Sequence, residues 1–99
     1  MNRKEDLGFM EQRRFREILE KLHRELHDTT SVDEKTKQLL QEVESDIQYI
    51  LHESEGEETR AHHTLNDRLK QAVGRLETTN PDLTETMRRV MNTLSNMGI

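Results

Sequence analysis

The sequence predicts an all-α fold in which four amphipathic helices form two antiparallel hairpins with coiled-coil-like seams. Apolar residues recur three and four positions apart along most of the chain, the spacing that gathers them on one side of an α-helix. Residues that start helices and residues that form turns divide this pattern into four segments. Because Phe9, Phe15 and Tyr49 are the only aromatic residues, we expect a thin, aliphatic core in a single helical domain at 9–99.

The first helix is expected at about 9–27. Residues 1–8 are rich in charged side chains and include Gly8, a residue type that weakens a helix, so we expect a flexible N-terminus. Glu17 and Lys21 are four positions apart, a favourable pairing that is typical of an exposed helix surface. The apolar face consists of Phe15, Ile18, Leu19, Leu22 and Leu26.

The second helix is expected at about 33–52, after the turn sequence DTTSVDE. Ser31 followed by Glu34 matches a capping box, while Asp33 is an alternative cap, so the helix should begin within about two residues of position 32. A turn this short makes the first two helices antiparallel neighbours. The apolar face consists of Leu39, Leu40, Val43, Ile47, Ile50 and Leu51.

The third helix is expected at about 58–77, after a linker at 53–59. The linker sequence, ESEGEET, places acidic residues at the negative end of the second helix and includes a glycine, Gly56. An alternative stays open, because three-four spacing can also be followed from Ile47 to Leu65, which would fuse helices two and three into one long helix. The apolar face consists of Ala61, Leu65, Leu69, Ala72, Val73 and Leu76.

The fourth helix, at about 81–97, has the clearest boundaries. Asn80 can cap its first turn through the side-chain oxygen, and Pro81 suits the first position because an N–H there would have no partner. At the other end, Gly98 can adopt the left-handed conformation and Ile99 can contact the last turn, as in a Schellman motif. We expect the apolar seam of this helix to be an interaction surface, formed by Leu83, Met87, Val90, Met91, Leu94 and Met97.

The chain resembles a bacterial family of short proteins known as domain of unknown function 4404, from about Phe15 onward. The residues that carry the likeness are Leu22-His23 with Leu26, the Ser31-Val32-Asp33 turn, Leu39-Leu40 with Ile47, Leu69 with Leu76, Pro81, and the ending Leu94-Ser95-Asn96-Met97-Gly98-Ile99. These are cap and core positions, and it is their order that is specific. The resemblance implies a small helical bacterial protein with no assigned activity, and it supplies no catalytic residue.

The only candidates for metal binding are histidines, and the sequence signal for them is weak. His23 and His27 are four positions apart and could share a helix face, but the residues between them do not give the H-E-x-x-H motif. We therefore expect surface or boundary histidines rather than a metal site. The chain has no cysteine, and its four glycines are too scattered to form a phosphate-binding loop. We expect no catalytic residue, no cofactor and no enzymatic activity.

The acidic charge is concentrated in the middle of the chain. Residues 28–58 carry 10 acidic and 2 basic side chains, whereas the whole chain has a net charge of −5. Either the acidic second helix packs beside the more basic helices one and four, which we favour, or it attracts a basic partner. Nucleic-acid binding is opposed by the total charge. It could recruit Arg68, Lys70, Arg75, Arg88 and Arg89.

These observations lead us to expect a protein-interaction or structural module that self-associates, because narrow apolar stripes often need a second copy of the chain to cover them. A small ligand- or metal-responsive regulator is the alternative, and nucleic-acid binding is a distant third. The first ten residues, MNRKEDLGFM, lack the apolar core of a signal peptide, and no apolar run approaches the length of a membrane span. We therefore expect a cytoplasmic protein without membrane contact.

Overall fold

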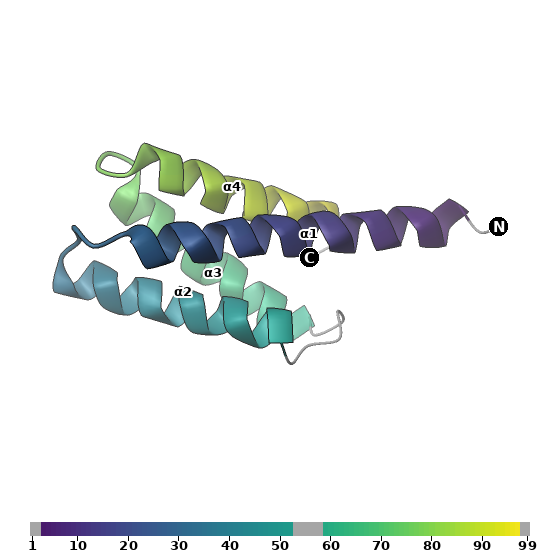
Figure 1. The fold of residues 1–99 in the computed structure, drawn as a ribbon, viewed down its shortest axis with the longest axis horizontal. Helices are drawn as coiled ribbons and strands as arrows, with labels where there is room; N and C mark the ends of the chain where they lie inside the picture. Colours follow the sequence, from purple (N-terminus) through teal and green to yellow (C-terminus); the bar gives the residue numbers. More distant parts are fainter. Residues whose placement is uncertain (1–2, 53–58, 98–99) are drawn as a thin grey trace.

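Four helices form an up-down-up-down bundle in the part of the chain that the structure describes. This computed structural model describes residues 3–52 and 59–97, and the side chains of 12–52 and 60–97. Each helix packs against two others, because α1 and α3 both contact α2 and α4 (Figure 1). The prediction of an all-α fold is confirmed. The helices are α1 (Arg3–Asp28), α2 (Glu34–His52), α3 (Thr59–Leu76) and α4 (Pro81–Asn96).

The two expected hairpins, α1–α2 and α3–α4, are joined into a closed ring by α2–α3 and α1–α4 contacts. Because α2 and α3 lie side by side, the alternative of one long fused helix is wrong. The expected linker at 53–59 falls mostly on residues 53–58, which lie outside the described residues. α1 begins at Arg3, ahead of the expected start near Phe9, and extends past the ends of the other helices (Figure 1). The flexibility expected for residues 1–8 stays a prediction.

Asp33 caps the start of α2. Its Oδ1 atom accepts a hydrogen bond of 2.7 Å from the backbone N–H of Thr36, so the structure selects Asp33 rather than Ser31 as the cap. Hydrogen bonds from the side chain and backbone of Thr36 hold the pKa of Asp33 below its ordinary value. At the end of α1, the Thr29 hydroxyl donates to the Glu25 carbonyl at 2.8 Å. Both sides of the α1–α2 turn are therefore fixed by local hydrogen bonds.

Asn80 precedes α4 as expected, but its side chain makes no capping hydrogen bond. The residue has φ −137° and ψ 69°, and this ψ lies well below the extended values usual for a side-chain cap. Instead, the Asn80 N–H donates to the Leu76 carbonyl at 2.7 Å, and the Thr84 hydroxyl donates to the Pro81 carbonyl at 2.9 Å. The prediction that the Asn80 side chain caps α4 by a hydrogen bond is therefore wrong. The Schellman motif expected at 98–99 lies outside the described residues.

The core is aliphatic, and the four apolar stripes cover one another within one chain. Ile18, Leu51, Met91 and Met97 are half-buried at its edge. Tyr49, 41% exposed, is the large hydrophobic side chain that remains at the surface of the described residues. The stripes therefore do not require a second copy of the chain to bury them. The buried hydrophobic residues are Phe15, Leu19, Leu22, Leu26, Leu39, Leu40, Val43, Ile47, Ile50, Leu65, Leu69, Ala72, Leu76, Leu83, Met87, Val90 and Leu94.

Four polar side chains are also buried, and the sequence pattern did not identify them. The hydroxyls of Thr84 and Thr86 donate hydrogen bonds, and Thr36 lies against Asp33, to which its backbone N–H donates. His62, which is 3% exposed, meets the ring of Phe15 edge-on, with the ring centroids 5.2 Å apart. These residues sit next to apolar core positions, so the helix geometry buries them together. In the described ranges, no helix has both the length and the apolar character needed to cross a membrane.

The acidic α2 lies beside α1 and α3, not beside α1 and α4 as expected, because the ring places α4 diagonally across the bundle. The basic side chain that forms the shortest ion pair with α2 is therefore Arg68 of α3. Arg68 Nη1 donates to both carboxylate oxygens of Asp46 at 2.8 Å, and its Nε lies 3.5 Å from Glu42 Oε2. Burial raises the pKa of Asp46, although the Arg68 guanidinium opposes this effect. On the α1 side, His23 Nε2 lies 3.9 Å from Glu44 Oε1. Part of the acidic charge is thus compensated within the chain.

Candidate functional site

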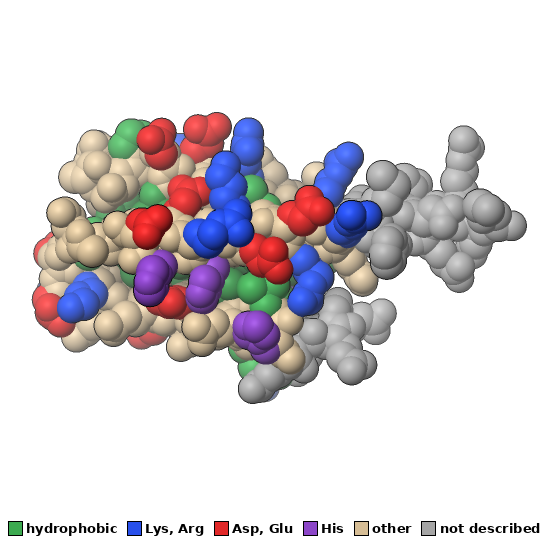
Figure 2. Space-filling model, in the orientation of Figure 1, with side chains coloured by type: hydrophobic (Ala, Val, Ile, Leu, Met, Phe, Trp, Pro, Cys, Tyr) green, Lys and Arg blue, Asp and Glu red, His purple; other side chains and the backbone are tan. Residues whose placement is uncertain are grey.

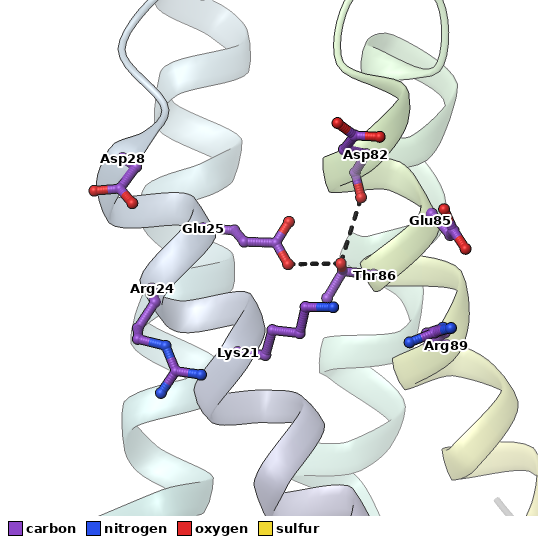
Figure 3. Close-up of a pocket in the computed structure, with 8 residues that line it drawn as sticks. All are labelled: Lys21, Arg24, Glu25, Asp28, Asp82, Glu85, Thr86 and Arg89. Carbon is purple, nitrogen blue, oxygen red and sulfur yellow. Dashed lines mark hydrogen bonds between the residues drawn. The ribbon is translucent and has the colours of Figure 1, made fainter.

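A groove runs between α1 and α4, and we call it the α1–α4 groove. It consists of two adjoining hollows of about 560 Å³ and 570 Å³ that share Lys21 and Arg89. Figure 3 shows the first hollow, into which side chains project from both helices. The groove is lined by Arg14, Glu17, Ile18, Lys21, Arg24, Glu25 and Asp28 of α1, and by Asp82, Glu85, Thr86, Arg89, Asn92 and Thr93 of α4.

Thr86 and Glu25 join the two walls of the groove. The Thr86 hydroxyl on α4 donates to Glu25 Oε1 on α1 at 2.7 Å, and the carbonyl of Asp82 is a weaker acceptor at 3.3 Å (Figure 3). Thr86 is buried, whereas Glu25 is half-buried and reaches in from α1. A hydrogen bond to a carboxylate is stronger than one between neutral groups. This bond therefore fixes how α1 and α4 face each other at the floor of the groove.

Most of the charged side chains around the groove have no partner in the described part of the chain. Among the described residues, no ion pair or side-chain hydrogen bond involves the basic side chains of Lys21, Arg24 and Arg89 or the carboxylates of Asp82 and Glu85. Lys21 extends across the groove toward α4 (Figure 3). These groups are solvated when the groove is empty. They are therefore able to form ion pairs with groups outside the described part of the chain.

The hydrogen bond between Thr86 and Glu25 gives a testable expectation. Thr86→Val should lower the free energy of unfolding by about 1 kcal/mol, because valine keeps the shape but removes the donor that bridges α1 and α4. Thr93→Val is the matched control, since the Thr93 hydroxyl donates only within α4, to the Arg89 carbonyl at 2.8 Å. Urea unfolding at neutral pH measures both variants. Equal losses for the two would contradict a bridging role for Thr86.

The structure places the expected interaction seam of α4 mostly inside the bundle. Leu83, Met87, Val90 and Leu94 are buried, and the two remaining members, Met91 and Met97, are half-buried against the core. The α1–α4 groove lies beside this seam and uses polar positions instead. Thr86 could have been found from the sequence, because it is three positions after Leu83 and four before Val90 and so shares their face. Its polar character hid it within an apolar pattern.

The weak metal candidates, His23 and His27, lie on the same side of α1, next to Glu44 of α2. His23 is half-buried and faces Glu44 of α2, whereas His27 is exposed. In the described residues, no group of three or more His, Asp or Glu side chains converges as a metal site would need. The basic residues considered for nucleic acid are also divided. Arg68 is held by α2, and Arg88 Nη2 donates to Glu77 Oε2 at 3.1 Å. In the described residues, the two histidines thus meet no third metal ligand, and the basic residues are not gathered on one surface.

The comparisons with known proteins agree with the resemblance seen in the sequence. Residues 15–99 match the family described as Domain of unknown function (DUF4404), which covers most of the chain, including every lining residue of the α1–α4 groove except Arg14. Searches of the curated proteins and of the solved structures returned no match. Because the family match spans far more than half of the sequence, this chain belongs to the family Domain of unknown function (DUF4404).

Proposed function

We propose that this protein is a small protein-interaction or structural module that self-associates. The observation that carries the proposal is the α1–α4 groove, where charged side chains of both signs stand unpaired, among the described residues, on two rigid helices. Functional surfaces built on helices hold their side chains in fixed positions, which favours recognition of a partner. The aliphatic interior in turn provides a scaffold whose positions are set by packing.

Charged groups, rather than apolar stripes, form the proposed contact. The apolar stripes that suggested self-association are buried within the chain, and Tyr49 is the large hydrophobic side chain that the described surface exposes. Contacts between charged groups weaken as salt screens them, with a screening length of about 30 Å at 0.01 M and about 3 Å at 1 M ionic strength. Self-association of this kind should therefore depend strongly on salt.

Sedimentation velocity of the full chain tests the proposal. In roughly 10 mM salt, and over protein concentrations from about 10 to 500 μM, the average mass should rise from 11.8 kDa toward twice that value. In roughly 1 M salt it should return to the mass of one chain. An average mass that stays at 11.8 kDa throughout the low-salt series would overturn self-association.

A further inference from the structure

We propose that a second copy of this chain docks on the α1–α4 groove, related to the first by a two-fold axis that sets the acidic end of each groove against the basic middle of the other. The inference rests on the proposed self-association and specifies its surface and symmetry. It is carried by the order of charges along the groove.

The acidic end of the groove is where α1 ends and α4 begins. Asp28 lies in the last turn of α1, and Asp82 and Glu85 lie in the first turns of α4. All three are exposed, and none forms an ion pair with another described residue. Figure 2 shows acidic side chains gathered at this end of the molecule, on the left of the view. The three carboxylates thus line the same end of the groove, Asp28 on one wall and Asp82 and Glu85 on the other, without an ion pair to a cation in the described part of the same chain (Figure 3).

The basic middle of the groove is one turn further along both helices. Lys21 and Arg24 lie on α1, and Arg89 lies on α4, four positions after Glu85. At a rise of about 1.5 Å per residue, four positions separate Glu85 from Arg89 by about 6 Å along the helix axis. Basic side chains follow the acidic ones toward the middle of the molecule (Figure 2). The sign of the charge therefore changes along the groove, and on both walls acidic and basic side chains lie about one helical turn apart.

A two-fold axis turns this pattern into a complementary contact. If the axis lies in the plane of contact and crosses the helices between Glu85 and Arg89, it places Glu85 of one copy opposite the partner's Arg89, and the reverse pair forms by symmetry. The bond between Thr86 and Glu25 puts this axis at about the level of Arg24 on α1, so the same operation brings Asp28 toward the partner's Lys21 and leaves Arg24 near the axis. Every favourable pair then occurs twice. A parallel arrangement would instead set like charges against each other, which is unfavourable.

The test uses one charge reversal at each end of the pattern and two matched controls. Glu85→Lys leaves two basic side chains at positions 85 and 89 of α4, and Arg89→Glu leaves two acidic ones there. Asp67→Lys and Lys70→Glu change the net charge by the same amounts at exposed positions of α3, away from the groove. All four substitutions are at exposed helix positions, and circular dichroism confirms that each variant is folded.

Sedimentation velocity at low salt should give a clear pattern. Glu85→Lys and Arg89→Glu should each weaken self-association about tenfold, because each reversal replaces two attractions by two repulsions in the symmetric pair. An equimolar mixture of these two variants should recover association at or above the level of the unchanged protein, since both cross-pairs are again opposite in charge. The α3 controls should behave like the unchanged protein.

The outcomes separate the two proposals. If the unchanged protein associates but Glu85→Lys and Arg89→Glu associate equally well, or if their mixture does not recover, the two-fold contact through this groove is wrong while self-association stands. If the unchanged protein never associates, both proposals fall. Loss of association in the α3 controls to the same degree would show that net charge alone governs it, and this also overturns the groove contact.

Discussion

Met87→Ala is expected to lower the free energy of unfolding by about 3 kcal/mol. Met87 is fully buried in α4, so its removal leaves a cavity that the surrounding aliphatic side chains fill only in part. A chain of this size is stable by about 5 to 15 kcal/mol, so this loss is a substantial fraction of the total. Urea unfolding followed by circular dichroism measures the change.

Met91→Ala provides the control for this experiment. Met91 has the same side chain and lies one turn further along α4, but it is half-buried at the edge of the core. Its truncation removes less apolar surface and opens no enclosed cavity, so we expect a loss of about 1 kcal/mol or less. If Met91→Ala were as destabilising as Met87→Ala, the packing assigned to α4 would be wrong.

Asp46→Ala is expected to lower the free energy of unfolding by about 1 to 2 kcal/mol at neutral pH. The substitution removes both acceptors of the Arg68 Nη1 hydrogen bonds that tie α2 to α3, and it leaves that guanidinium without its closest carboxylate. The value lies below that for a fully buried pair, because Arg68 is one-third exposed and water can replace part of the interaction. Urea unfolding at neutral pH measures the loss.

Glu42→Ala is the matched control for Asp46→Ala. Glu42 lies one turn earlier on α2 and approaches the same guanidinium at 3.5 Å, but its side chain is 56% exposed. An exposed ion pair contributes little, so the expected loss is about 0.5 kcal/mol or less. Comparable losses for the two variants would mean that burial of Asp46 does not strengthen its contact with Arg68.

The raised pKa of Asp46 predicts how the free energy of unfolding changes with pH. Burial raises this pKa above 3.8, so the folded chain binds the Asp46 proton more tightly than the unfolded chain does. The contribution of this carboxyl to stability therefore falls as the pH rises from about 3.8 through the folded pKa. Asp46→Asn removes the titration, so the stability of the unchanged protein relative to Asp46→Asn should decline over this range. A relative stability that rises with pH would contradict the raised pKa.

Much of the candidate groove could not be read from the sequence. Lys21, Glu25 and Arg89 look like ordinary charges on exposed helix faces, because helix periodicity says which residues share a face but not which helix that face meets. The bond between Thr86 and Glu25 joins residues 61 positions apart, and no local pattern signals it. The helices and their apolar faces were predictable, whereas the groove depends on the pairing of α1 with α4.

The sequence by itself predicted four helical segments and the stripes that fill the core, because these follow from local spacing. It left open whether helices two and three were separate, and it placed the start of α1 too late. Asp33 shows the limit of that reasoning, since two caps fitted the sequence and backbone geometry selected one. Only the tertiary structure decided that the two hairpins close into a ring, which sets α1 beside α4 and α2 beside α3. Helix order around a bundle is fixed by the packing of distant side chains. The structure therefore placed the acidic α2 against Arg68 and left the charges of the α1–α4 groove facing outward.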